Sequence, residues 1–477
     1  MLTYSFHNIG SDSLYEHLYK SIKNDILKGT LKTGDKLPSK RSFAKNLGVS
    51  TITVENAYGQ LMAEGYIYSI PKKGYYVSDL EAGQISRHIP IGRSPHSHGF
   101  HGSKEKPAGK PYFADFTSNQ THSDNFPFSV WAKIIRELLS DQQNALMKNS
   151  PSCGIFPLQA AIAQHLKDFR GMEIFPEQII IGAGTEYLYG LLIELLGYDK
   201  NYCLENPGYQ KISQIYTSHH VKVTHASMDN NGIQIEELDR LEAQIVHISP
   251  SHHFPTGILM PIGRRYELLG WASKDENRYI IEDDYDSEFR LSGKPVPTLQ
   301  SIDVLEKVIY INTFTKTLAS TIRISYMVLP MHLVRIFHEK LSFYSCTVST
   351  FEQYTLTHFI REGYFEKHIN RMRNYYQKKR NLLLNAIRTN PLSHFVTISE
   401  EDAGLHFLME INAPIDEETF KLRAEEKGVH ISSLADYYVL PPAVKRPVFL
   451  INYSSIPDEN IPEAVNRIYQ CLRDYIP

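Results

Sequence analysis

The chain has 477 residues, enough for about three folding units, and its 42% hydrophobic and 22% charged residues are typical of a soluble globular protein. Its four cysteines, Cys153, Cys203, Cys346 and Cys471, lie far apart, which excludes a disulfide framework and favours reduced thiols. The sequence shows neither a secretion signal nor an apolar stretch long enough to span a membrane. We therefore expect a cytoplasmic protein with no membrane partner.

Charge is distributed unevenly along the chain. The formal net charge is −3, but residues 1–78 contain ten lysines and arginines against six acids, so this part carries +4 and the remainder −7. A basic module joined to an acidic body is the asymmetry expected when only one part of a protein contacts phosphate groups.

Residues 12–78 combine three helical patterns with a basic hairpin. The first helix has an apolar residue at every fourth position, which predicts one buried stripe. A short second helix follows Ser39, and a third follows Ser50, because each serine stands where a helix N-cap is required. Two strands, at 66–70 and 75–78, follow the helices. This order predicts a winged helix-turn-helix.

The third helix of such a module lies in the major groove of DNA, while the start of the second helix and the basic turn meet the phosphate backbone. The alternative is a small helical domain used for protein contacts. We favour DNA because the basic residues occupy the tips of the motif. The residues predicted to contact DNA are Ser39, Lys40, Arg41, Ser50, Thr51, Thr53, Asn56, Lys72 and Lys73.

The stretch LPSKRSFAKNLGVSTITVENAYGQLMAEGYI (37–67) resembles the GntR family of bacterial repressors. That resemblance implies a double-stranded DNA operator as the partner. Members of the family usually carry arginine where this chain has Thr51, so the resemblance implies the DNA-binding fold but leaves the base preference open.

The rest of the chain divides into a linker and a large domain. Residues 79–110 are rich in Gly, Ser, Pro, His and Lys, which predicts a flexible linker. Its histidines His96, His98 and His101 could form a metal-binding tract, but we favour a solvated linker and expect no metal site there. Over residues 111–477, apolar β-rich runs alternate with helical patterns, as in a doubly wound α/β domain. The clearest strand candidates are 178–181, 245–248, 279–282 and 308–312.

Three segments of this domain carry chemistry. IIGAGTEYLYGLL (180–192) reads as a strand, a glycine-rich turn and a helix, an arrangement that aims backbone amides at a phosphate. IEDDYDSEF (281–289) places an acid at the end of a strand, where α/β proteins bind ligands. NTFTKTLASTIRISY (312–326) sets Lys316 among hydroxyl residues directly after a strand. The first two signals are weak alone.

Together these segments supply what a pyridoxal phosphate site requires. A lysine amine forms the Schiff base, a carboxylate holds the ring nitrogen protonated, and hydroxyls, amides and an arginine bind the phosphate. The alternative is that Lys316 is an ordinary surface lysine. The residues that fit these roles are Lys316, Asp283, Tyr285, Thr313, Arg323, Gly184 and Thr185.

The order of these motifs resembles a class I/II aminotransferase, a fold type I pyridoxal phosphate protein. Its attachment to a GntR-type module resembles the MocR/GabR family of bacterial transcription regulators, with GabR-type members closest in SPSHHFPTGILMP (249–261) and RISYMVLP (323–330). The resemblance implies an α/β protein in which a linker joins a winged helix-turn-helix to an aminotransferase-type domain.

The same resemblance assigns roles in the cofactor site. Lys316 would join the cofactor, Asp283 would pair with the ring nitrogen, and Tyr285 would hydrogen-bond the ring hydroxyl. Thr313, Arg323, Gly184 and Thr185 would hold the phosphate, with Tyr209 beside the ring. Arg446 stands where the family places an arginine that clamps an effector carboxylate, a role suited to a bidentate guanidinium; the alternative is a solvated loop arginine.

Three departures from the related pattern bear on function. Phe254 stands where aminotransferases typically have an asparagine that contacts the ring hydroxyl, which weakens the case for efficient turnover. Lys211 replaces an arginine of GabR-type members, so a second effector contact becomes a point charge; a γ-aminobutyrate-like amino acid stays one candidate. Glu186, beside the phosphate turn, would repel the phosphate, and the sequence offers no account of it.

The leading hypothesis is a transcription regulator that captures a small amino compound as an external aldimine on Lys316. The resemblance implies a head-to-tail homodimer. The alternative is a working aminotransferase with an accessory DNA-binding module, and at most a slow half-reaction is expected of a regulator. A third hypothesis is an aminotransferase-like body that dimerises the DNA module without any cofactor.

Overall fold

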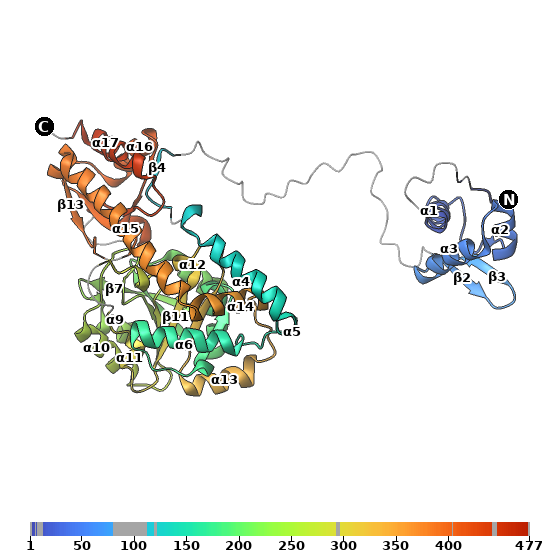
Figure 1. The fold of residues 1–477 in the computed structure, drawn as a ribbon, viewed down its shortest axis with the longest axis horizontal. Helices are drawn as coiled ribbons and strands as arrows, with labels where there is room; N and C mark the ends of the chain where they lie inside the picture. The colour runs from blue at the N-terminus through green and yellow to red at the C-terminus, as the bar shows by residue number, and fades with distance from the viewer. Residues whose placement is uncertain are drawn as a thin grey trace. The chain divides into compact units, whose positions relative to one another are not determined.

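A computed structural model describes residues 2–4, 6, 13–79, 112–118, 122–291, 296–402, 404–440 and 446–475. The linker predicted over residues 79–110 therefore lies outside the described residues except for its first position. The chain divides into two compact units, Met1–Glu105 and Lys106–Pro477, and each is considered by itself (Figure 1). Among the described residues, no helix is both long and apolar enough to cross a membrane.

The three predicted helices of the N-terminal unit are present. They are α1 (Leu14–Leu27), α2 (Lys40–Leu47) and α3 (Thr51–Ala63). The side chains of Ser39 and Ser50 cap α2 and α3, as the sequence predicts. Gly48 ends α2 at φ 68°, a left-handed conformation that glycine adopts without steric cost. The apolar stripes of the three helices meet in one core, which contains Leu18, Ile22, Phe43, Val54, Ala57, Tyr58 and Leu61.

A small sheet completes this unit. It consists of β1 (Lys36–Leu37), β2 (Ile67–Ile70) and β3 (Gly74–Val77) in the order β1-β3-β2, with antiparallel pairs. The predicted hairpin is β2–β3, and its turn places Lys72 at φ 64°. The sequence analysis did not identify β1, because a two-residue strand has no periodic pattern to reveal it.

The C-terminal unit is built on an eight-stranded sheet with the order β5-β12-β11-β10-β9-β6-β7-β8. Strands β6, β7, β9, β10 and β11 are parallel, whereas β12 runs antiparallel to both β5 and β11. All four predicted strands are present, each shifted by no more than one residue. The strands are β5 (Ile179–Gly182), β6 (Asn201–Asn206), β7 (Lys222–Asp229), β8 (Gly232–Ile233), β9 (Ile245–Ile248), β10 (Tyr279–Asp283), β11 (Val308–Thr313) and β12 (Ser325–Val328).

Helices cover both faces of this sheet (Figure 1). On one face α4, α6 and α14 pack over Ile179 and Tyr326. On the other, α7 and α13 pack over Ile180 and Met327. The alternation of neighbouring strand residues between two cores confirms the doubly wound prediction. The helices are α4 (Phe128–Asp141), α5 (Gln143–Leu146), α6 (Phe156–Arg170), α7 (Thr185–Leu196), α8 (Gln210–Ser218), α9 (Ile235–Arg240), α10 (Ile262–Ala272), α11 (Leu299–Ile302), α12 (Phe314–Thr317), α13 (Met331–Leu341) and α14 (Thr350–Arg361).

A second, smaller layer is built from the C-terminal part of the chain together with β4 (Ala114–Asp115), which precedes the large sheet. The 26-residue helix α15 (Tyr364–Thr389) contacts α14 in the large layer and α17 in the small one (Figure 1). The small layer contains a sheet of order β13-β14-β17-β16 and a parallel pair, β4 with β15. Its elements are β4 (Ala114–Asp115), β13 (Val396–Ser399), β14 (His406–Ile411), α16 (Glu417–Glu426), β15 (Val429–His430), β16 (Ser432–Ser433), β17 (Val448–Asn452) and α17 (Ile461–Leu472).

Candidate functional site

A cavity of about 300 Å³ lies at the carboxyl ends of β6, β9, β10 and β11. In parallel α/β sheets this edge is where ligands bind, because loops from neighbouring strands converge there. The cavity brings together residues from segments that are more than a hundred positions apart in sequence. The predicted residues that line it are Thr185, Tyr209, Lys211, Asp283, Tyr285, Thr313, Lys316 and Arg323.

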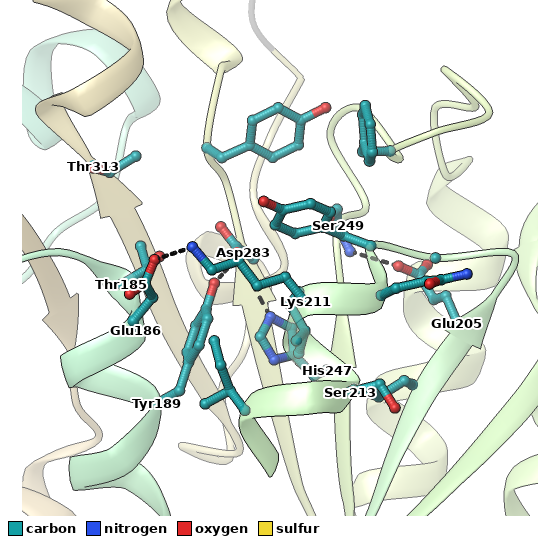
Figure 2. A pocket seen from close by; sticks show the side chains of 18 of the residues that line it. Thr185, Glu186, Tyr189, Glu205, Lys211, Ser213, His247, Ser249, Asp283 and Thr313 are labelled. Carbon is teal, nitrogen blue, oxygen red and sulfur yellow. Dashed lines mark hydrogen bonds and ion pairs between the residues drawn. The ribbon is translucent and has the colours of Figure 1, made fainter. Parts of the chain in front are cut away.

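Asp283, the last residue of β10, lies at the floor of the cavity (Figure 2). Its Oδ2 accepts hydrogen bonds from the Tyr189 hydroxyl at 2.5 Å and from His247 Nε2 at 3.4 Å. The Tyr216 hydroxyl in turn donates to His247 Nδ1 at 2.8 Å. Asp283 Oδ1 is buried and has no hydrogen-bond partner, so one carboxylate oxygen is left to accept from a group inside the cavity.

Tyr189 and His247 were missed by the sequence analysis. Burial raises the pKa of Tyr189 well above its usual value, and the adjacent Asp283 carboxylate adds to that shift, so the tyrosine stays a hydrogen-bond donor. Two signals could have found them. His247 is the one polar residue in the apolar run Ile245–Ile248, and Tyr189 lies one helical turn after Thr185.

Lys316 lies in the short helix α12, directly after β11. The Thr313 hydroxyl accepts a hydrogen bond from the Thr315 amide at 3.1 Å and so fixes the start of this helix. Burial lowers the pKa of the Lys316 amine, and the nearby Asp286 carboxylate opposes the shift only in part. A lysine with a lowered pKa has more of the neutral, nucleophilic amine at neutral pH.

The glycine-rich turn faces Arg323. Gly184 adopts φ 95° before α7, and a Cβ atom at this position would lie 2.5 Å from Arg323 Nη2. The absence of a side chain at residue 184 therefore lets the guanidinium approach the start of α7. Thr185 opens that helix, whose first backbone amides carry partial positive charge. Guanidinium, amides and the Thr313 hydroxyl form a corner suited to a phosphate.

Glu186 does not stand unpaired at this corner. Its carboxylate contacts the Lys211 ammonium on α8 and lies 3.6 Å from Arg323 Nη2. The hydrogen bond from Lys211 lowers the pKa of Glu186, so the carboxylate stays ionised. The structure thus accounts for a residue that the sequence left unexplained, and it places Lys211 in an ion pair within the cavity (Figure 2).

A buried histidine–aspartate pair contacts Tyr285. The Tyr285 hydroxyl lies 3.2 Å from His252 Nδ1, and His252 Nδ1 lies 2.8 Å from Asp286 Oδ2. Burial lowers the pKa of His252, but the Asp286 carboxylate outweighs it, so the net shift is upward. The sequence analysis did not single out His252 or Asp286. The doubled histidine before Phe254 was the available signal.

Tyr209 and Arg446 differ in their relation to the cavity. Tyr209 is 49% exposed at the rim, and its ring meets that of Phe254 edge-on at 5.7 Å. Arg446 has 69% of its side chain exposed and lies 3.7 Å from Glu410, so its guanidinium is not among the groups that line the cavity. Residues 441–445, which precede it, lie outside the described part of the chain.

The residues predicted to contact DNA differ in their contacts within the N-terminal unit. Ser39, Ser50 and Thr53 act in helix capping, since the Ser50 hydroxyl accepts from the Thr53 amide at 3.1 Å and lies 2.8 Å from Thr53 Oγ1. Lys40 Nζ lies 2.6 Å from Glu55 Oε1. The exposed residues of the predicted set are Ser39, Arg41, Ser50, Thr51, Asn56, Lys72 and Lys73.

Comparison with known proteins agrees with both units. Residues 14–77 match the family described as bacterial regulatory proteins, gntR family. The sequence is 36% identical to an uncharacterized HTH-type transcriptional regulator, YdeL of Bacillus subtilis, over 95% of this chain and 96% of that protein. It is 31% identical to the probable rhizopine catabolism regulatory protein MocR of Rhizobium meliloti, over 95% of this chain and 93% of that protein.

Among solved structures, the kynurenine aminotransferase of Pyrococcus horikoshii, determined with PMP, is similar to 76% of this chain and 90% of its own, with a TM-score of 0.66 and 24% identity. This likeness shows the fold alone. It confirms the prediction of an aminotransferase-type domain behind the N-terminal module. Within the described residues, no group of three or more His, Cys, Asp or Glu side chains is arranged to hold a metal ion.

Proposed function

Because the chain belongs to the MocR-type regulators of the GntR family, DNA-binding proteins with an aminotransferase-like domain, we propose that it holds pyridoxal phosphate and changes its DNA binding in response to a small amino compound. The observation that carries this proposal is the buried, unpartnered Asp283 Oδ1 in a cavity that also contains Lys316 and Arg323. A pyridinium N–H is the donor such an oxygen requires.

The lining residues fit the cofactor part by part. Asp283 would hold the ring nitrogen, with Tyr189 and His247 fixing its carboxylate. Bound pyridoxal phosphate supplies an electrophilic carbon for amines and a ring that withdraws electrons. Lys316 would attach the cofactor and Tyr285 would bond its hydroxyl. The phosphate would lie among Gly184, Thr185, Thr313 and Arg323, with Tyr209 at the rim.

The effector in this proposal is a small primary amine, and a γ-aminobutyrate-like amino acid is one candidate. Lys211 is engaged by Glu186, so an effector carboxylate at Lys211 must compete with an ion pair. In our proposal the exposed guanidinium of Arg446, which lies 3.7 Å from Glu410, binds the effector carboxylate.

Coupling to DNA requires that the effector bind two arrangements of the protein with different affinity. We place the two arrangements in a homodimer, in which two N-terminal units engage spaced half-sites of an operator. Base and phosphate contacts in this proposal come from the exposed ends of α2 and α3 and from the β2–β3 turn, which carries Lys72 and Lys73.

The test compares the full chain with Lys316→Ala and with Lys307→Ala, a half-buried lysine that does not line the cavity. Each protein is mixed with pyridoxal phosphate, and its visible spectrum is recorded during titration with a panel of amino compounds. We expect a lysine-dependent band in wild type and Lys307→Ala that one compound shifts, and no such band in Lys316→Ala. A band that survives Lys316→Ala would refute the assignment.

DNA affinity is measured on the same samples. The responsive compound should change the affinity of wild type and leave that of Lys316→Ala unchanged, because only wild type can couple cofactor chemistry to DNA. Sustained consumption of the amine with an α-keto acid acceptor, without any change in DNA affinity, would identify an aminotransferase instead. Phe254, at 5.5 Å from the His406 ring, is packed at the place expected of an amide in such enzymes.

A further inference from the structure

The exposed face of α3 carries a bulky apolar residue, Ile52, that does not contribute to the described core of its unit. The buried side of this helix is filled by Val54, Ala57, Tyr58 and Leu61, all at 0% exposure. Ile52 points away from them with 68% of its surface exposed, the largest value among the bulky apolar residues described in the N-terminal unit. It belongs to no part of the described core of that unit.

The surroundings of Ile52 are those of a DNA-reading surface. Thr51 and Asn56 are exposed on the same part of α3, and Asn56 lies one turn after Ile52. Arg41 at the start of α2 and the turn lysines are exposed as well, so cations for the phosphate backbone stand on neighbouring elements. An alkyl side chain amid such groups lies where the family contacts DNA.

A branched alkyl group can neither donate nor accept a hydrogen bond. In the major groove, the base-edge group that an alkyl side chain contacts favourably is the C5-methyl of thymine, whereas the other positions offer donors and acceptors. An isoleucine left in contact with those polar edges would strip them of water without replacing the lost hydrogen bonds. An isoleucine on a base-reading surface would therefore discriminate in favour of thymine and against cytosine at the position it contacts.

We infer that Ile52 is a specificity-determining residue that contacts the methyl group of a thymine in each operator half-site. The inference uses the DNA-binding unit alone and is independent of the cofactor. Its strength follows from apolar burial: removing one methyl group from the contact should weaken binding about three- to fivefold.

The experiment replaces single thymines by deoxyuridine, which deletes the C5-methyl and leaves the hydrogen-bonding edge unchanged. Operator duplexes are first selected from a random pool with the full-length wild type. Dissociation constants are then measured at one fixed salt concentration for wild type, Ile52→Ala and Ile52→Val. Leu27→Ala, which removes an apolar side chain 44% exposed on α1, is the matched control.

We expect one thymine per half-site at which wild type loses about three- to fivefold on uracil substitution and Ile52→Ala loses nothing, because its contact is already gone. Ile52→Val should keep part of the effect, and Leu27→Ala should behave as wild type. Equal uracil penalties in wild type and Ile52→Ala would overturn the inference. So would a wild type indifferent to every uracil, or selected operators that share no thymine.

Since Ile52 is exposed, its truncation should leave the thermal unfolding of the chain unchanged, which separates lost contact from lost fold. The salt dependence of binding should also be the same for wild type and Ile52→Ala, because an alkyl contact releases no counterions. A flatter salt dependence in Ile52→Ala would mean that the helix had lost phosphate contacts, and the thymine contact would be refuted.

Discussion

At the scale of single residues, the position of Arg323 in the cavity depends on the absence of a side chain at Gly184. Gly184 has φ 95°, outside the range that most L-residues occupy, and Arg323 fills the space where its Cβ would stand. Sequence reasoning identified both residues but not their contact. The sequence suggests only that a turn needs the backbone freedom of glycine. The close approach of Arg323, which also requires glycine at this position, becomes visible only in the structure.

Gly184→Ala should therefore weaken the binding of pyridoxal phosphate by roughly tenfold or more, from backbone strain and displacement of Arg323 together. The measurement is a fluorescence or absorbance titration of the full chain. Gly270→Ala is the control, since nothing lies within 4 Å of a Cβ there and no left-handed backbone is involved. Equal affinity in the two variants would show that Arg323 does not bind the phosphate.

At the scale of elements, an ion pair joins α2 and α3 on the surface predicted to contact DNA. Lys40 of α2 is hydrogen-bonded to Glu55 of α3, which raises the pKa of the lysine. Glu55 has 57% of its side chain exposed, so its carboxylate faces the same solvent as the basic groups around it. A phosphate that approaches Lys40 must replace this carboxylate.

Glu55→Gln should free Lys40 and remove a negative charge from the surface, so affinity for non-specific duplex DNA should rise. The log–log salt dependence should steepen by about one unit if Lys40 then meets one more phosphate. Binding is measured at several salt concentrations, with Glu16→Gln on α1 as a charge-matched control. An unchanged slope would mean that Lys40 stays out of the interface.

The elements were predictable where the pattern was long. Helices α1, α2 and α3 and strands β5, β9, β10 and β11 follow from apolar period and capping residues. Strand β1 did not, because two residues carry no period. Within the site, Lys316, Asp283 and Arg323 follow local motifs, whereas His252 and Asp286 acquire their contact only when distant loops meet. The spacing of residues in the sequence cannot predict a contact between distant loops.

At the scale of the whole molecule, the C-terminal unit buries carboxyl groups that resist ionisation. Burial raises the pKa of Glu205 to about 8, and burial with the neighbouring Asp284 raises that of Glu282 and of Glu288 to about 7. Each is protonated over part of the range in which an unfolded glutamate has lost its proton. At these three positions the folded chain then binds more protons than the unfolded chain.

The stability that these three carboxyl groups contribute should accordingly fall as pH rises between the ordinary glutamate value and about 8. Buried histidines such as His253, whose pKa burial lowers to about 3, act in the opposite direction below about pH 6.5, so the contribution of Glu205 is isolated by a variant. Urea unfolding of the full chain at about pH 5.5 and about pH 8.5 tests the direction. Glu205→Gln should reduce the loss, while Glu177→Gln, an exposed site, should not. An equal pH dependence of stability in wild type and Glu205→Gln would contradict the assignment.

One further property follows from the short strand β1. It pairs with β3 through Lys36 and Tyr76, and it ends immediately before the residues that open α2. The β2–β3 turn and the start of α2 are thereby held at a fixed separation. In a complex where both meet DNA, as we propose, that separation would make binding depend on groove width as well as on base sequence.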